Sequence, residues 1–147
     1  MTLQNLAKIG QLNPHKATAE DVARLLTAVR RNLSDAKSKV ISNETRFDCA
    51  YKAIMQCALL AMMANGYRPS TSAPGHHQTM LQSLPLTLGV SNDVWIVLDA
   101  LRKKRNQNDY TGMPLAEAEA QEAVDRAKEL LVTLQAHLRS HHPLLLK

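Results

Sequence analysis

The sequence is poor in aromatic residues, which make up 3% of its 147 residues. Modules that bind single-stranded RNA or DNA by stacking, such as OB-folds, need several exposed aromatic side chains. A stacking platform and base-specific recognition are therefore not predicted. The chain also lacks the glycine patterns of P-loop and Rossmann sites, a nucleophile elbow and paired catalytic carboxylates. These absences argue against the common nucleotide-binding and hydrolase classes.

Cysteine is scarce as well, with Cys49 and Cys57 as the two examples. They are separated by two turns of one predicted helix, which puts their backbones about 12 Å apart and too far apart for a disulfide. No cluster of cysteine and histidine accompanies them, so zinc is not expected, and no metal or cofactor is predicted. We interpret both residues as reduced thiols that fill the core.

The sequence lacks the features of a secretory signal and of a membrane span. Its start, MTLQNLAKIGQL, has no charged leading segment, no uninterrupted apolar run and no small-residue cleavage site. The most apolar run, CALLAMMA, is shorter than the roughly 20 residues that cross a bilayer. The expected location is the cytoplasm, with no membrane partner.

Positive charge is in surplus, with 18 lysines and arginines against 13 acidic residues and a formal net charge of +5. This balance favours RNA, a nucleotide or another acidic partner. A helix-turn-helix that reads DNA is not favoured, because it needs an exposed basic recognition helix. The most basic helix predicted here instead turns an arginine toward its apolar stripe.

The spacing of apolar residues predicts an all-α protein, an antiparallel up-and-down bundle of four to five helices. Residues 1–16 are expected to be a leader with a partial helix, residues 17–140 a single bundle domain, and residues 141–147 a frayed or partner-held tail. No alternating pattern typical of β-strands competes with this prediction.

Capping residues predict where the helices begin and end. Thr18 starts the first helix, which reaches the low thirties or continues to residue 41. Asn43 starts the second helix, and Asn65 with Gly66 ends it. Its segment 53–64 is apolar on nearly every side, so this helix must be central.

The second half of the chain holds three further helices. Residues 66–75 are rich in proline, glycine and hydroxyl residues and predict a loop, which a short helix over 75–84 follows. Ser91 or Asn92 caps the next helix, and Gly112 stops it. Pro114 fits the first turn of the long last helix.

The basic segment RKKRNQNDY, Arg102 to Tyr110, ends the helix that starts near residue 92. Helical periodicity places Arg105 within about 40° of the centre of the apolar stripe. A guanidinium in that place needs a carboxylate, a cleft open to solvent or an anionic ligand. Asp109, at i+4, is one candidate carboxylate. Lys103 points away, and Lys104 is expected to be an ordinary surface residue.

LRKKRNQNDY at the end of an amphipathic helix resembles the arginine-asparagine signature of the HEPN superfamily. NETRFDCAYKAIMQCALLAMMANGYRP, which precedes a loop and a short helix led by GHH, resembles a type of central helix found in that superfamily. The resemblance covers roughly residues 40–112. It implies a helical bundle, commonly dimeric, and in many members a metal-independent ribonuclease that acts as a toxin or defence effector.

Carried over to this chain, the resemblance assigns Arg105 and Asn106 to the signature pair. Tyr110 stands where a histidine often follows. Tyrosine is a poor base and a reasonable hydrogen-bond donor, so Asp109, or His76 or His77 from the preceding helix, is a candidate proton acceptor if RNA is cleaved. The expected catalytic residues are thus Arg105, Asn106, Asp109 and Tyr110, and the expected RNA- or phosphate-binding residues are Arg102, Arg46, His76 and His77.

Two functions from different classes follow. The first is a HEPN-like RNA- or nucleotide-binding protein, with ribonuclease activity left open, in a toxin–antitoxin or defence system. The second is an inactive helical adaptor that dimerises and binds a protein partner such as a nucleotidyltransferase. Arg46, Asp48 and Tyr51 lie near the start of the central helix, where they form either part of the same cleft or a salt bridge and hydroxyl at the end of the bundle.

Overall fold

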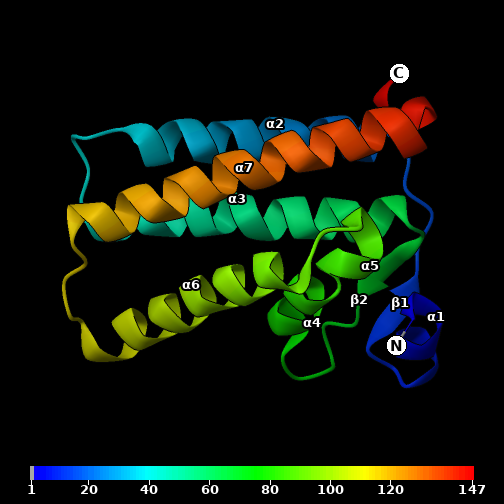
Figure 1. Cartoon of the computed structure of the whole chain (residues 1–147), viewed down its shortest axis with the longest axis horizontal. Helices are drawn as coiled ribbons and strands as arrows, with labels where there is room; N and C mark the ends of the chain where they lie inside the picture. Colours follow the sequence, from blue (N-terminus) through cyan, green and yellow to red (C-terminus); the bar gives the residue numbers. More distant parts are fainter. Residues whose placement is uncertain (1) are drawn as a thin grey trace.

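The computed structural model describes residues 2–147, and it is 74% helical. The prediction of an all-α protein is confirmed. Four long helices dominate it, α2 (Ala19–Lys37), α3 (Asn43–Ala64), α6 (Asn92–Thr111) and α7 (Glu117–His141). Successive long helices run in alternating directions, with α2 and α7 lying side by side along one flank of α3 and α6 along the other (Figure 1).

Capping interactions account for most of the helix starts. The Thr18 hydroxyl accepts from the backbone N–H of Asp21, and the Asp21 carboxylate accepts from Thr18, both at 3.1 Å. Ser42 caps α3 by accepting from the N–H of Thr45 at 3.1 Å, so the helix begins at Asn43 instead of being capped by it. Such hydrogen bonds satisfy backbone donors that the first turn of a helix leaves free.

The last helix begins later than Pro114. Its first residue is Glu117, and the Glu119 carboxylate accepts from the backbone N–H of Ala116 at 3.0 Å. This capping hydrogen bond fixes the start of α7 and leaves Pro114 in the preceding loop. Gly112 ends α6 with φ of 67°, the left-handed conformation that glycine adopts without steric cost.

The leader contains more structure than a partial helix. After α1 (Leu3–Lys8), strand β1 (Leu12–Pro14) pairs antiparallel with β2 (Tyr67–Pro69), a segment expected to be part of a loop. Leu12, 1% exposed, fixes this small sheet to the core. Strands of three residues are too short to show the alternation by which a strand is predicted.

Helix α3 forms the centre of the molecule. Thirteen of its 22 residues are buried, and α2, α7, α4 (His76–Gln82), α5 (Leu84–Leu88) and α6 all contact it. It is also long and apolar enough to cross a membrane, contrary to the expectation from CALLAMMA, and 67% of its most apolar window is buried inside the protein. Its composition is therefore that of a core helix covered on nearly every side.

The tail is packed rather than frayed. The 3-10 helix η1 (Pro143–Leu146) contacts α2 and α7, and Leu145 packs against the core.

Arg46 joins three helices through its guanidinium. From α3, its Nε donates to the carbonyl of Ala36 at 2.9 Å, and one terminal nitrogen donates to Oε1 of Gln121 on α7 at 3.1 Å. The side chain is only 2% exposed. Ala36 lies at the C-terminal end of α2, where carbonyls lack helical partners and the helix dipole is negative. Within residues 2–147 the guanidinium forms no ion pair, and these carbonyl and amide acceptors stabilise it in place of a carboxylate.

We expect Arg46→Ala to lower the free energy of unfolding by about 3 kcal/mol, because it leaves a buried carbonyl unpaired and opens a cavity. Urea denaturation measures this change. Arg139→Ala, at an exposed position of α7, is the matched control and should change stability by less than about 0.5 kcal/mol. Equal stability of the two variants would contradict the role assigned to Arg46.

Candidate functional site

An open cavity of about 520 Å³ lies beside α3, bounded by α4, α6 and the segment that follows α3. Its floor is one face of α3, which contributes Asp48, Tyr51, Lys52, Met55, Gln56 and Leu59. These residues recur every three or four positions, the spacing of one face of a helix. The opposite walls are His76, His77 and Met80 of α4, Arg105 of α6, and Arg68, Pro69 and Thr71. Side chains from four separate parts of the chain therefore meet at one place.

Arg105 lies over the ring of Tyr51, with its Cζ 4.9 Å from the ring centroid. Its side chain is 34% exposed, with Nε 3.7 Å from Oδ1 of Asp48 and 4.0 Å from Oδ2 of Asp109. Both distances exceed the range of a hydrogen bond. Neither carboxylate holds this guanidinium in a hydrogen bond, so an anionic ligand can bind the donors that do not contact Tyr51.

Tyr51 connects Arg105 to a histidine. Its hydroxyl lies 3.0 Å from Nδ1 of His77, while the tyrosine itself is 3% exposed. Burial raises the pKa of Tyr51 above its usual value, and burial together with the neighbouring His76 lowers the pKa of His77. Both groups are therefore neutral at neutral pH, and His77 has one ring nitrogen beyond the tyrosine contact for accepting or donating a proton.

His76 and Asp48 complete the polar end of the cavity. The rings of His76 and His77 meet edge to face, with centroids 4.7 Å apart. Partial burial raises the pKa of the Asp48 carboxyl, and the charge of Arg105 opposes that rise. Lys52, Arg68 and Arg105 give the lining three cationic side chains against the single carboxylate of Asp48. The local charge suits an anionic ligand.

The structure brings Arg105, His76 and His77 together but leaves other predicted site residues elsewhere. Arg46 is buried at the end of α2, as described above. Arg102 forms an ion pair with the buried Asp99, Nε to Oδ1 at 2.6 Å. Neither Arg46 nor Arg102 lines the cavity, whereas Arg105 does.

The remaining residues of the RNxxDY segment lie at the surface of α6. Asn106 is exposed, Tyr110 is 92% exposed, and Asp109 touches the site only through its 4.0 Å contact with Arg105. Lys104 pairs with Glu119 of α7. The position where the resemblance expects a histidine therefore faces solvent, and the histidine near Arg105 comes from α4.

Sequence reasoning missed the part of α3 beyond Tyr51. The segment 53–64 was predicted to be a core segment, and no residue of it was predicted to line a site. The helical spacing of Met55 and Leu59 from Asp48 and Tyr51 could have predicted that these residues share one face of α3. Which faces of α3 stay uncovered depends on the packing of α4 and α6, which periodicity in α3 does not specify.

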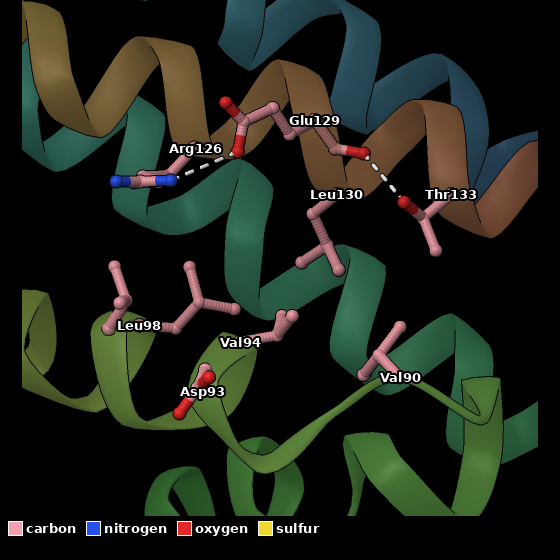
Figure 2. Close-up of a pocket in the computed structure, with 9 residues that line it drawn as sticks. Val90, Asp93, Val94, Leu98, Arg126, Glu129, Leu130 and Thr133 are labelled. Carbon is pink, nitrogen blue, oxygen red and sulfur yellow. Dashed lines mark hydrogen bonds and ion pairs between the residues drawn. The ribbon is translucent and has the colours of Figure 1, made fainter.

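A second cavity of about 230 Å³ lies between α6 and α7 (Figure 2). Its walls are mostly apolar and include Val90, Val94, Val97, Leu98 and Leu130. At its rim Arg126 pairs with Glu129 at 3.2 Å, and Thr133 donates to the carbonyl of Glu129 at 3.0 Å. These polar groups bond to one another, so this cavity offers less chemistry than the first.

No group of three or more histidine, cysteine, aspartate or glutamate side chains within residues 2–147 is arranged to hold a metal ion. His137, His141 and His142 gather at the end of α7, where His137 and His141 stack with centroids 4.3 Å apart. Burial and their histidine neighbours lower the pKa of His137 and of His142.

The lowered pKa values of His77, His137 and His142 predict that acid destabilises the protein. In the unfolded chain histidine has a pKa near 6.5, so the unfolded chain binds protons more readily than the folded protein. The contribution of these histidines to the free energy of unfolding is therefore fully present above about pH 6.5 and is lost as the pH falls below it. We expect a smaller free energy of unfolding in urea at about pH 5.5 than at about pH 7.5, a window above the titration of carboxylates. His77→Gln should reduce this difference, and an identical difference in both proteins would contradict the burial of a neutral His77.

Comparisons with protein-family models, with curated proteins and with solved structures give no match to this chain. The features that bear on function are the residues of the cavity and the resemblance carried by Arg105 and Asn106.

Proposed function

We propose that this protein binds RNA through a phosphate group at Arg105 and cleaves it as a metal-independent ribonuclease. The observation that supports this most is the chain of contacts in the cavity. A half-exposed arginine lies over a buried tyrosine, and the hydroxyl of that tyrosine holds a neutral histidine. An anion-binding group and a proton acceptor are thereby placed in one open site.

Arg105 is suited to the phosphate for physical reasons. Its planar guanidinium is charged at every physiological pH and binds two phosphate oxygens at once. Tyr51 orients this guanidinium by packing against its face. The long contacts to Asp48 and Asp109 are ones that a phosphate oxygen at hydrogen-bond distance can outcompete. Lys52 and Arg68 add positive charge to the same cavity.

His77 supplies the proton acceptor in the proposed reaction. It takes the proton of a ribose 2′-hydroxyl, whose oxygen attacks the adjacent phosphorus, while Arg105 stabilises the charge that develops on the phosphate oxygens. The bond to the 5′-oxygen breaks, and His76 gives that oxygen a proton. The products are a 2′,3′-cyclic phosphate and a 5′-hydroxyl, and no oxidant, metal or cofactor takes part.

The HEPN resemblance supports the same proposal from the sequence. Arg105 has the place of the signature arginine, and His77 takes over the proton transfer for which Tyr110, 92% exposed, is unsuited. A homodimer, a role in a toxin–antitoxin or defence system, and a cytoplasmic location complete the proposal on this basis. The alternative of an inactive adaptor draws on the exposure of Tyr110 and Met113 at the end of α6, where a protein partner can bind.

Arg105→Ala should weaken binding of single-stranded RNA at least about tenfold and reduce cleavage about 100-fold, because it removes the phosphate contact from ground state and transition state alike. Fluorescence anisotropy and gel analysis of labelled RNA measure these changes, with EDTA present throughout. Lys103→Ala is the matched control, since Lys103 lies on the same helix with a side chain 70% exposed. The proposal would be refuted if the wild type neither binds nor cleaves RNA. It would also be refuted if Arg105→Ala and Lys103→Ala bind and cleave RNA equally well.

His77→Gln should retain RNA binding while cleavage falls about 100-fold or more, because an amide cannot accept the proton. On the acid limb of the wild-type pH profile, cleavage should rise with pH and reach half its maximum below about pH 6.5, since the pKa of His77 is lowered. Tyr51→Phe keeps the ring under Arg105 but not the hydroxyl, so kcat should fall about tenfold with KM unchanged. A pH profile that His77→Gln leaves unaltered would remove His77 from the mechanism.

A further inference from the structure

The same cavity has an apolar end that the proposed chemistry does not use. Met55 of α3 and Met80 of α4 are both buried, at 7% and 5% exposure, and they line the cavity together with Leu59 and Pro69. This end is continuous with the polar end because all these residues border one cavity of about 520 Å³. A ligand that fills the cavity must therefore have an anionic part and an apolar part.

The register of α3 sets the distance between the two ends. Tyr51, Met55 and Leu59 are four residues apart on one helical face, and each step advances about 6 Å along the axis. A phosphate held at Arg105, above Tyr51, therefore leaves the next one to two turns of α3 free for the rest of the molecule. The cavity volume lies within the range of small-molecule sites.

Building on the proposed function, we propose that the apolar end is a subsite for one unpaired nucleobase, attached to the phosphate that Arg105 binds. Met55, Leu59 and Met80 form its apolar lining, and Gln56 is its polar contact. The ligand is a single nucleotide, either free or within a single strand.

The lining favours a flat, polarisable ring over an alkyl chain. Methionine sulfur makes favourable contacts with aromatic rings, and two methionines border this end of the cavity. Oε1 of Gln56 accepts from Nδ2 of Asn32 at 2.8 Å, which holds the amide and leaves its Nε2 as a donor for the edge of a base. An alkyl chain would offer no acceptor to Nε2 of Gln56 and no partner to the hydroxyl of Thr71.

The same lining predicts tolerance among the four bases. Methionine side chains adapt their shape to the ligand, and a single amide donor distinguishes bases poorly. A base that is stacked and paired in a duplex cannot enter, because the subsite lies inside the cavity rather than on a groove-shaped surface. The subsite therefore selects single strands without selecting a sequence.

Isothermal titration calorimetry with adenosine 5′-monophosphate and ribose 5-phosphate separates the two ends of the site. We expect the wild-type protein to bind adenosine 5′-monophosphate about tenfold more tightly than ribose 5-phosphate. Arg105→Ala should weaken the binding of both ligands. Equal affinity for the two ligands would overturn the base subsite while leaving phosphate binding in place. If neither ligand depends on Arg105, the proposed function fails, and the subsite fails with it.

Leu59→Gln tests the lining directly, because Leu59 is half-buried and the substituted side chain is of similar size. We expect about fivefold weaker binding of adenosine 5′-monophosphate and unchanged binding of ribose 5-phosphate. Unchanged ribose 5-phosphate binding also shows that the variant is folded. Leu131→Gln makes the same substitution at a half-buried position of α7 outside the cavity and should affect neither ligand. Equal effects of the two variants on the nucleotide would overturn the assignment.

A single-stranded RNA hexanucleotide, compared with the same strand in a duplex, tests access to the subsite. Tighter binding of the single strand, lost in Leu59→Gln but not in Leu131→Gln, supports entry of a base from a strand. If adenosine 5′-monophosphate binds but the hexanucleotide shows no preference for the single strand, the subsite accepts free nucleotides and not strands. If single strand and duplex bind equally and Leu59→Gln weakens neither the nucleotide nor the strand, the proposed subsite is overturned.

Discussion

The structure depends on the need to cover α3. This helix is apolar on nearly every side, and 13 of its residues are buried, so it is stable in water only when other helices surround it. α2 and α7 cover one flank, and α4, α5 and α6 cover much of the other. The strip from Asp48 to Leu59 is the part of α3 left beside an open cavity. The candidate site is thus a consequence of incomplete coverage, which exposes one face of the core helix between α4 and α6.

Two arginines show how the same side chain serves different purposes in this bundle. Arg46 is buried, and its charge is stabilised by the carbonyl end of α2 and by an amide, which engage its Nε and one terminal nitrogen. Arg105 contacts Tyr51, and both nearby carboxylates lie beyond hydrogen-bond range, so donors of its guanidinium remain available to a ligand. Burial and hydrogen bonding fix the first as part of the fold. Partial exposure at the mouth of a cavity makes the second the group that can exchange its partners for a ligand.

The sequence predicts those features of the fold that depend on residues close together in the chain. Capping at Thr18, the end of α6 at Gly112 and the central position of 53–64 depend on neighbouring residues, and the structure contains each of them. The pairing of Leu12 with Pro69, the hydrogen bond from Arg46 to Ala36 and the meeting of Tyr51 with His77 join residues far apart in the chain. Periodicity placed Arg105 near the apolar stripe but did not show which ring it would face, because that depends on how α6 packs against α3 and α4.

His77 lies on α4, so the basic segment Arg102 to Tyr110 of α6 does not contain every group that the proposed reaction needs. In the proposed reaction Arg105 of α6 holds the phosphate, whereas Asn106 and Tyr110 of the same helix are exposed and do not line the cavity. The proposed proton acceptor, His77, comes from α4 and contacts Tyr51 of α3. In the proposed reaction, phosphate binding therefore depends on α6 and proton transfer on α4, with Tyr51 as the shared support. A change in the angle between α4 and α6 would separate the two activities without removing any catalytic group, because each group is positioned by a different helix.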